Sequence, residues 1–224
     1  GQIATLIVPA DCAWNESVNP VAARDIPKAP SASDDAISTA TEMLAKGKTT
    51  ILLMSNMALS EHCLELADQI SQATGAKIFC DTFITRLSRG EGRCTVSRLG
   101  YFAEQATVQI EDAEQIIMVG TKAPVSFFAY PGKASEFSPE GSTQHTLADV
   151  SEDAEDALQK LADRLNAGSF EPRKTPLQQP GLGEGELSSK NLALIFAELL
   201  PVDSIVVDEG GTAGALCFPI SENA

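Results

Sequence analysis

The chain has 224 residues, of which 43% are hydrophobic and 21% charged, so it can bury a sizeable core and is not disordered as a whole. Acidic residues outnumber basic residues by 31 to 16, which sets the net charge at -15. A surface this acidic repels phosphate backbones and anionic lipids, which argues against nucleic-acid and polybasic membrane binding. No apolar run approaches the roughly 18 residues that a membrane span needs.

The cysteines and histidines carry no recognisable motif. The five cysteines are Cys12, Cys63, Cys80, Cys94 and Cys217. Their wide spacing argues against a zinc ribbon, a thioredoxin motif or a disulfide scaffold. We interpret them as buried thiols and expect reducing, cytoplasmic surroundings. His62 and His145 have neither metal-ligand nor catalytic-triad spacing.

The chain begins and ends in segments typical of interrupted domains. Residues 3–8 (IATLIV) are apolar and β-branched, as in a buried strand. Near the other end, residues 204–207 (SIVV) indicate a strand, residues 208–212 a tight turn and residues 213–218 a turn of helix. We therefore expect an interior piece of a longer polypeptide, in which both end segments lie displaced. A whole small protein is the less favoured alternative.

Between these ends, helix and strand patterns alternate. In chain order we expect a helix at 34–46, a strand at 49–54, a helix at 60–74, a strand at 76–80, a loop at 81–100, a short helix at 101–106, strands at 115–119, 125–130 and 145–147, and helices at 151–167 and 188–200. Strands that are apolar throughout, separated by helices, are typical of a parallel sheet covered on both faces. Residues 34–167 are therefore predicted to form an open, doubly wound, Rossmann-like α/β domain.

Ligands of such sheets bind at the carboxyl ends of the strands. The candidate loops are 55–60, 81–92 and 120–124, and none carries a glycine-rich dinucleotide or P-loop motif. Two aromatic pairs, Tyr101-Phe102 and Phe127-Phe128, are expected to be core residues rather than a stacking platform.

Four arginines gather in the loop that follows the second strand. They are Arg86, Arg89, Arg93 and Arg98. Such a group could bind an anion such as a nucleotide phosphate. In a chain this acidic we favour the alternative, in which these arginines tie a long loop to the acidic surface.

The turn at residues 208–212 (DEGGT) is the strongest chemical signal. Gly210 and Gly211 leave backbone N–H groups free, Thr212 offers a hydroxyl, and the expected helix contributes the positive end of its dipole. Together these groups make a cradle suited to a diphosphate. A strand-turn-helix junction with two glycines of purely steric origin is the alternative.

The ordered segments ATLIVPADCAW, GAKIFCDTF, IIMVGTKAPVSFFAYPGKAS and SIVVDEGGTAG resemble thiamine-diphosphate-dependent enzymes of the acetolactate synthase large-subunit and benzoylformate decarboxylase type. The resemblance spans the whole chain. It implies that residues 1–17 end a pyrimidine-binding domain, 34–167 form the central domain and 187–224 begin a diphosphate-binding domain. Residues 18–33 and 168–186 would be linkers.

The resemblance also implies the cofactors. Gly210, Gly211 and Thr212 match the family's first diphosphate-contacting loop, and thiamine diphosphate with Mg²⁺ would serve the parent enzyme. The family's activating glutamate would precede this chain and its magnesium motif would follow it, so no catalytic residue and no metal ligand is assigned here. FAD is doubtful, because Ser55-Asn56 stands where many relatives have a Gly pair and RLGYF departs from the usual FAD-contacting loop.

By this resemblance the parent enzyme would cleave a 2-keto acid next to its carbonyl, as a carboligase or a decarboxylase, and would be a homodimer or homotetramer. The segment alone would be inactive. Two alternatives remain open: a stand-alone FAD- or ADP-binding module that uses residues 55–60 and 86–93, and a purely structural oligomerisation domain.

Overall fold

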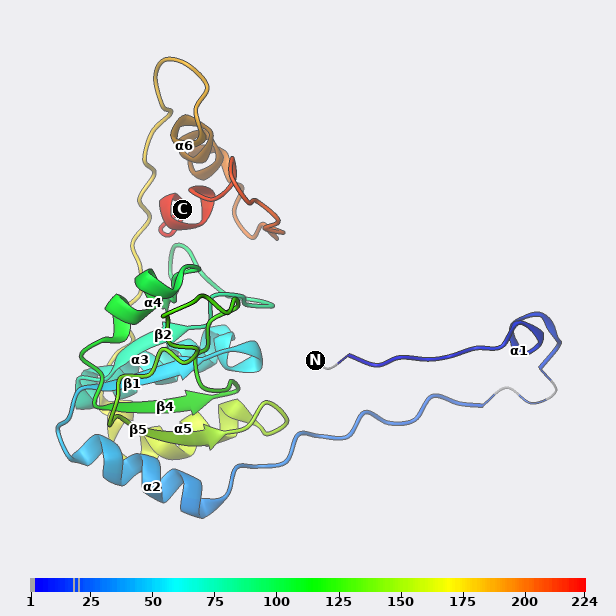
Figure 1. Cartoon of the computed structure of the whole chain (residues 1–224), viewed down its shortest axis with the longest axis horizontal. Helices are drawn as coiled ribbons and strands as arrows, with labels where there is room; N and C mark the ends of the chain where they lie inside the picture. The colour runs from blue at the N-terminus through cyan, green and yellow to red at the C-terminus, as the bar shows by residue number, and fades with distance from the viewer. Residues whose placement is uncertain (1–2, 18, 20) are drawn as a thin grey trace.

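The centre of the molecule is a single parallel sheet in this computed structural model, which describes residues 3–17, 19 and 21–224. Its strands are β1 (Thr50–Met54), β2 (Lys77–Cys80), β3 (Ser97–Arg98), β4 (Gln115–Val119) and β5 (Thr143–Ala148). They pair in the order β3-β2-β1-β4-β5, and every neighbouring pair is parallel (Figure 1). The strand order reverses between β1 and β4, which confirms the doubly wound fold.

Helices cover both faces of the sheet, because alternate residues of each central strand point to opposite sides. The helices are α2 (Asp34–Ala45), α3 (Glu61–Thr74), α4 (Ala103–Ile110) and α5 (Ala154–Arg164). Leu52 of β1 and Ile117 of β4 belong to the core cluster under α2, α3 and α5, whereas Ile51 and Ile116 belong to the cluster under α4. The core is mostly aliphatic, with Phe79 and Phe137 buried in the cluster under α4.

Local sequence signals define the predicted helix ends well. The Ser33 hydroxyl accepts a hydrogen bond from the Ala36 N–H at the start of α2, and Ser60 caps α3 in the same way. Gly75 ends α3 with a φ of +79°, a left-handed conformation that glycine adopts without steric cost. Asp153 caps α5 through the Asp156 N–H, so this helix begins a few residues later than expected.

Three features of the sheet differ from the predictions. No strand forms at residues 125–130, which belong to an irregular excursion held by an isolated bridge between Val125 and Glu136. The place beside β4 is taken instead by β5, which is longer than the predicted segment 145–147. The short strand β3 was not predicted. Outside the sheet, α4 begins two residues later and ends four residues later than the helix expected at 101–106.

The strand expected at residues 3–8 is not formed. These residues run in an exposed segment followed by α1 (Ala10–Trp14), and Ile3 and Ile7 are 101% and 87% exposed (Figure 1). The strand expected at residues 204–207 is also absent, and Ile205 is 93% exposed. In both cases an apolar segment lacks a neighbouring strand, so it cannot satisfy its backbone groups as a strand.

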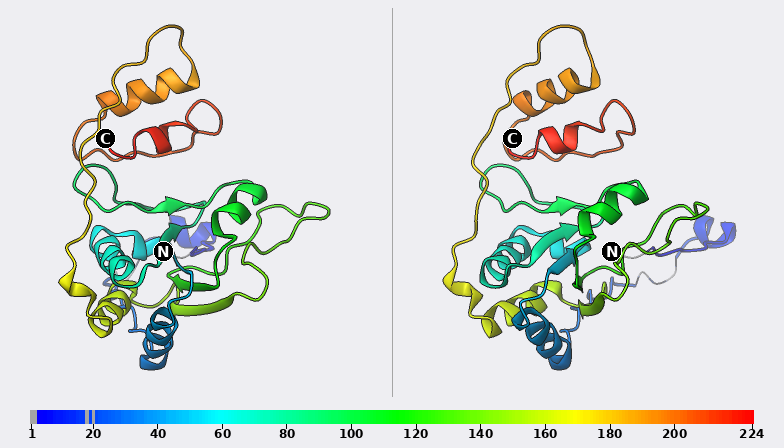
Figure 2. Two further views of the ribbon diagram at one scale, coloured as in Figure 1. Left: turned by 90° about the vertical axis from the view of Figure 1, so that its left-hand side faces the viewer. Right: turned by 60° about the vertical axis from the view of Figure 1, so that its left-hand side comes forward.

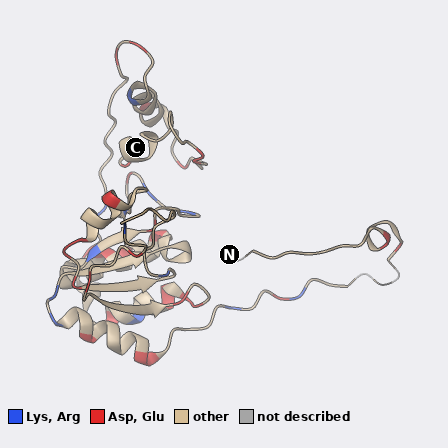
Figure 3. Ribbon diagram, in the orientation of Figure 1, with Lys and Arg blue, Asp and Glu red and all other residues tan. Residues whose placement is uncertain are grey.

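We call the last part of the chain, residues 187–224, the C-terminal unit, and residues 181–186 contact its first helix. It contains α6 (Ser189–Leu199) packed against α7 (Cys217–Ile220) and stands apart from the sheet in two further views (Figure 2). The helix expected at 213–218 is observed as α7, which is shorter and starts later, at Cys217. Asp and Glu are scattered over the outer helices and the end segments, in keeping with the acidic composition (Figure 3).

All five cysteines are free thiols, but only three are buried. Cys12 is exposed and Cys217 partly exposed, so the expectation that all are buried is wrong for these two. Burial raises the pKa of the Cys80 thiol to about 12 and that of Cys94 to about 11, so both stay protonated and unreactive near neutral pH. No helix in the described part of the chain is both long and apolar enough to cross a membrane.

Candidate functional site

The carboxyl edge of the sheet, at the point where the strand order reverses, is filled by the chain itself. The Asn56 amide donates to the Gly120 carbonyl oxygen at 2.8 Å, which joins the loops after β1 and β4. The Thr121 hydroxyl donates to Asp81 Oδ2 at 2.6 Å, which joins the loops after β4 and β2. Gly120 has a φ of +65°, and a Cβ there would lie 2.8 Å from the Ser55 carbonyl oxygen. The crevice that receives ligands in related sheets is thus occupied by protein groups.

Asp81 is the one carboxyl group in this network, and its pKa is raised above 3.8. Burial is the main cause, because it disfavours the charged form. Hydrogen bonds from Thr121 and Ser55 act in the opposite direction but are smaller contributions.

Asp81→Asn is expected to change how stability depends on pH. A carboxyl whose pKa is raised on folding binds more protons in the folded state, so its contribution to stability is lost as pH rises through the folded pKa. Asparagine can still accept the Thr121 hydrogen bond and does not ionise. The free energy of unfolding, measured by urea at a series of pH values, should therefore improve in D81N relative to the wild type as pH increases. A constant difference at every pH would contradict this assignment.

The four loop arginines do not form one anion site. Arg93 Nε lies 3.4 Å from Glu61 Oε2, an ion pair of the kind expected for a loop tied to the acidic surface. The guanidinium carbons of Arg89 and Arg98 lie 4.0 and 3.8 Å from the ring centroid of Phe218, in the C-terminal unit. Arg86 is exposed.

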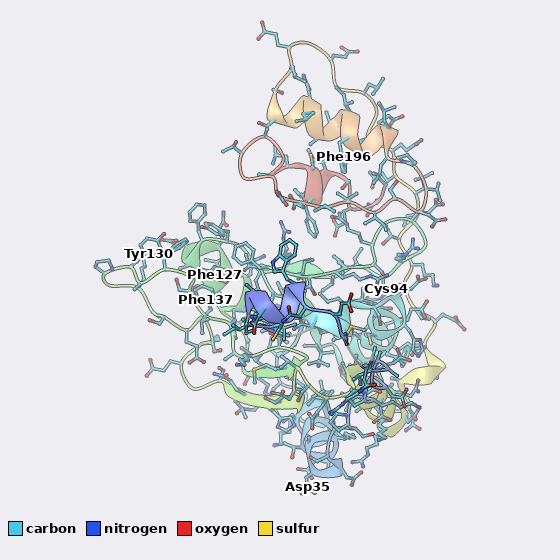
Figure 4. The ribbon with its side chains drawn as sticks, turned by 90° about the vertical axis from the view of Figure 1, so that its right-hand side faces the viewer. Asp35, Cys94, Phe127, Tyr130, Phe137 and Phe196 are labelled. Atoms are coloured by element: carbon cyan, nitrogen blue, oxygen red, sulfur yellow. The ribbon has the colours of Figure 1, made fainter. Side chains whose placement is uncertain are left out.

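The aromatic pairs predicted for the core lie at the surface instead. Six rings gather on the loops at the carboxyl edge of the sheet, with neighbouring centroids 4.6 to 6.1 Å apart, and Figure 4 labels two of them. They belong to Phe83, Tyr101, Phe102, Phe127, Phe128 and Tyr130, each at least 41% exposed. The prediction failed because these rings pack on one another while the aliphatic side chains fill the core.

The glycine turn expected to hold a diphosphate is exposed along its length. The Gly210 N–H donates to Asp208 Oδ1 at 2.9 Å, and a Cβ on Gly210 would lie 2.8 Å from Gly214 Cα, so the turn is tight. A Cβ on Gly211 would meet nothing within 4 Å. Gly211 and Thr212 are exposed and so accessible to an anion, although α7 begins too late to add its dipole there.

Neither histidine is part of a chemical site. His145 Nε2 lies 2.8 Å from the Ala36 carbonyl oxygen, and His62 Nδ1 lies 3.7 Å from Glu65 Oε2. Within the described ranges, no three His, Cys, Asp or Glu side chains gather as metal ligands would. No residue of this chain is therefore assigned to Mg²⁺.

No family model matches the chain. Over 215 residues it is 40% identical to "Putative acetolactate synthase large subunit IlvX" of Mycobacterium tuberculosis, an alignment that covers 96% of this chain and 41% of that protein. The chain is thus similar in sequence to a putative acetolactate synthase large subunit. This relationship confirms the resemblance carried by the sequence segments.

Two solved structures share the fold of this chain. One is a "putative thiamin diphosphate-dependent enzyme" of Mycobacterium smegmatis, with a TM-score of 0.66 and 15% identity over 92% of this chain and 42% of that one. The other is the thiamine diphosphate-dependent 4-hydroxybenzoylformate decarboxylase of Rhodococcus jostii RHA1, with a TM-score of 0.60 and 17% identity over 90% of this chain and 40% of that one. The chain thus spans about two fifths of the length of each relative.

Proposed function

We propose that this chain is the central region of a thiamine-diphosphate-dependent 2-keto acid carboligase or decarboxylase of the acetolactate synthase type. The observation that carries the proposal is the 40% identity to an acetolactate synthase large-subunit-like protein over 96% of the chain. In this proposal residues 1–17 end a pyrimidine-binding domain, residues 34–167 are the central domain, and residues 187–224 begin a diphosphate-binding domain. The linkers are residues 18–33 and 168–186.

Gly210, Gly211 and Thr212 are proposed as the part of the diphosphate site that lies in this chain. Bound thiamine diphosphate would supply an electron sink for cleavage of a 2-keto acid next to its carbonyl. The contribution of these exposed residues would be to bind and orient it, through the backbone N–H groups of Gly211 and Thr212 and the Thr212 hydroxyl. Mg²⁺ is proposed as the second cofactor of the parent enzyme, and FAD is not part of the proposal.

The segment is further proposed to be inactive alone and to act within a homodimer or homotetramer in the cytoplasm. The exposed apolar residues of segments 3–8 and 204–207 support inactivity of the lone segment and its action within an oligomer, because a larger assembly would bury them. The five free thiols support the cytoplasmic location, because disulfides are rare in reducing surroundings.

Gly211→Ala tests the proposed diphosphate turn. The added methyl group meets open space in the protein, so folding should be unaffected, but it would project toward the bound diphosphate. In the complete product of the gene, with Mg²⁺ present, we expect the Kd for thiamine diphosphate to rise roughly tenfold by calorimetry. Gly168→Ala is the matched control, because its Cβ also meets nothing within 4 Å. Equal affinities for both variants would remove the turn from the cofactor site.

Turnover of pyruvate by the 224-residue chain tests the proposed inactivity. With thiamine diphosphate and Mg²⁺ added, we expect neither carbon dioxide nor acetolactate to form, whereas the complete gene product should consume a 2-keto acid. Calorimetry of the same chain with ADP and with FAD tests the nucleotide-binding alternative. Micromolar binding of either would favour that alternative over the proposed role.

A further inference from the structure

We propose that Arg89, Arg98 and Phe218 form an interdomain latch that seats the C-terminal unit on the central domain. The latch would make the two arginines positioning residues for the turn that contains Gly211. Its role in cofactor binding rests on the proposed function, whereas the latch itself rests on contacts within this chain.

The contact is built around one aromatic ring. The guanidinium carbons of Arg89 and Arg98 lie 4.0 and 3.8 Å from the centroid of the Phe218 ring. Arg89 Nη2 also donates to the Phe218 carbonyl oxygen at 2.6 Å. A cation within 6 Å of a ring centroid is attracted by the negative ring face, so each arginine contributes to holding this ring.

The surrounding backbone is shaped for the same contact. Gly90 lies beside the end of the chain, and a Cβ there would be 2.5 Å from the Ala224 carbonyl oxygen. The linker at residues 168–186 also contacts this end of the chain, because the Gln178 N–H donates to the Asn223 carbonyl oxygen at 2.9 Å. A side chain on Gly90 would force these segments apart, so the glycine permits the close approach that the latch needs.

The charges in the latch act in opposite directions, because burial and the neighbouring Arg98 lower the pKa of Arg89 whereas Glu222 raises it. Neither Arg89 nor Arg98 has a carboxylate within ion-pair distance in the part of the chain that the structure describes, although the chain carries a net charge of -15. Two such cations repel each other, and the Phe218 ring face is the negative group that both contact. Glu222, four residues further on, adds an attractive charge toward Arg89.

The latch also explains why an arginine-rich loop follows β2 in an acidic protein. The loop at residues 81–100 belongs to the central domain, and Arg98 ends its edge strand β3. Phe218 lies six residues beyond Thr212 in the C-terminal unit. Fixing Phe218 thus restricts where the glycine turn can lie relative to the carboxyl edge of the sheet.

Hydrogen exchange of the 224-residue chain tests the latch without any cofactor. Phe218→Leu keeps an apolar side chain but removes the ring face. We expect exchange in peptides covering residues 87–98 and 213–224 to accelerate roughly tenfold, with β1 and β4 unchanged. Phe218→Tyr retains an aromatic ring, so its exchange should be as slow as that of the wild type. Arg98→Gln should accelerate exchange in the 213–224 peptide as Phe218→Leu does.

Two matched controls separate the latch from general packing. Phe196→Leu alters another phenylalanine of the same unit, in α6, and Arg86→Gln removes an exposed arginine of the same loop. Arg86→Gln should exchange like the wild type in the 213–224 peptide, and Phe196→Leu should accelerate its exchange less than Phe218→Leu does, because α6 packs against α7 but Phe196 is not the ring that the arginines contact. Equal exchange in Phe218→Leu and wild type, or failure of Phe218→Tyr to restore protection, would overturn the latch. Because no thiamine diphosphate is present, neither result bears on the proposed cofactor site, and failed cofactor binding would leave the latch intact.

Discussion

Replacing Arg173 by alanine is expected to lower the free energy of unfolding by about 3 kcal/mol. Arg173 Nη2 and Nε donate to Asp68 Oδ1 at 2.6 and 2.9 Å, and the Asp68 side chain is only 7% exposed. Removal of the guanidinium leaves a buried carboxylate without its cation. The Arg173 N–H, which donates to Asp68 Oδ2 at 2.7 Å, and the Gln72 amide can still hydrogen-bond it, which keeps the loss at the lower end of the range for broken buried pairs.

Asp68→Ala should cost less than Arg173→Ala, about 1 to 2 kcal/mol. The asymmetry arises because the Arg173 side chain is 63% exposed, so water can solvate the cation when its partner is gone. The double variant should therefore be more stable than Arg173→Ala alone. Urea unfolding of the three variants measures these differences.

Lys174→Ala is the control for this pair. Arg173 and Lys174 belong to an extended segment, residues 170–175, that lies along α3 and that we call the strap. Lys174 Nζ lies 2.7 Å from Glu65 Oε1 of α3, but both side chains are accessible to water. Such a surface pair contributes about 0 to 1 kcal/mol. A loss from Lys174→Ala as large as that from Arg173→Ala would show that detachment of the strap, rather than a stranded buried charge, causes the effect.

Gly120→Ala is expected to have the second large effect, a loss of about 3 kcal/mol. Two costs combine at this residue. Its φ of +65° is unfavourable for a side chain by roughly 1 kcal/mol, and its Cβ would lie 2.8 Å from the Ser55 backbone oxygen. The loops after β1 and β4 would have to separate, which would also strain the Asn56 hydrogen bond to the Gly120 carbonyl.

Gly47→Ala isolates the first of these costs. Gly47 has a nearly identical φ of +66°, but a Cβ there meets nothing within 4 Å. We expect it to cost only about 1 kcal/mol in the same urea experiment. If the two alanine variants were equally stable, the close approach of the loops at the carboxyl edge would contribute nothing.

Much of the central domain could be predicted from local sequence patterns. Continuous apolar runs defined β1 and β4, and Ser33, Ser60 and Gly75 marked helix ends because capping depends on residues close in sequence. The segments IATLIV and SIVV show the limit of such patterns. Their composition favours strands, but a strand forms only where another strand can pair with its backbone, and none lies beside them here.

The features of the candidate site also fall into those that local sequence patterns predict and those that depend on long-range contacts. The doubly wound domain, the family resemblance and the glycine turn at Gly210 could be predicted from the amino-acid sequence, since they depend on periodicity and on short ordered motifs. The contact of Arg173 with Asp68, the contact of Phe218 with Arg89 and the position of the aromatic rings outside the core became visible in the folded chain alone. Asp68 and Arg173 are 105 residues apart, and Arg89 and Phe218 are 129 apart. Contacts over such separations are selected by how the whole chain packs, and no local pattern in the sequence encodes them.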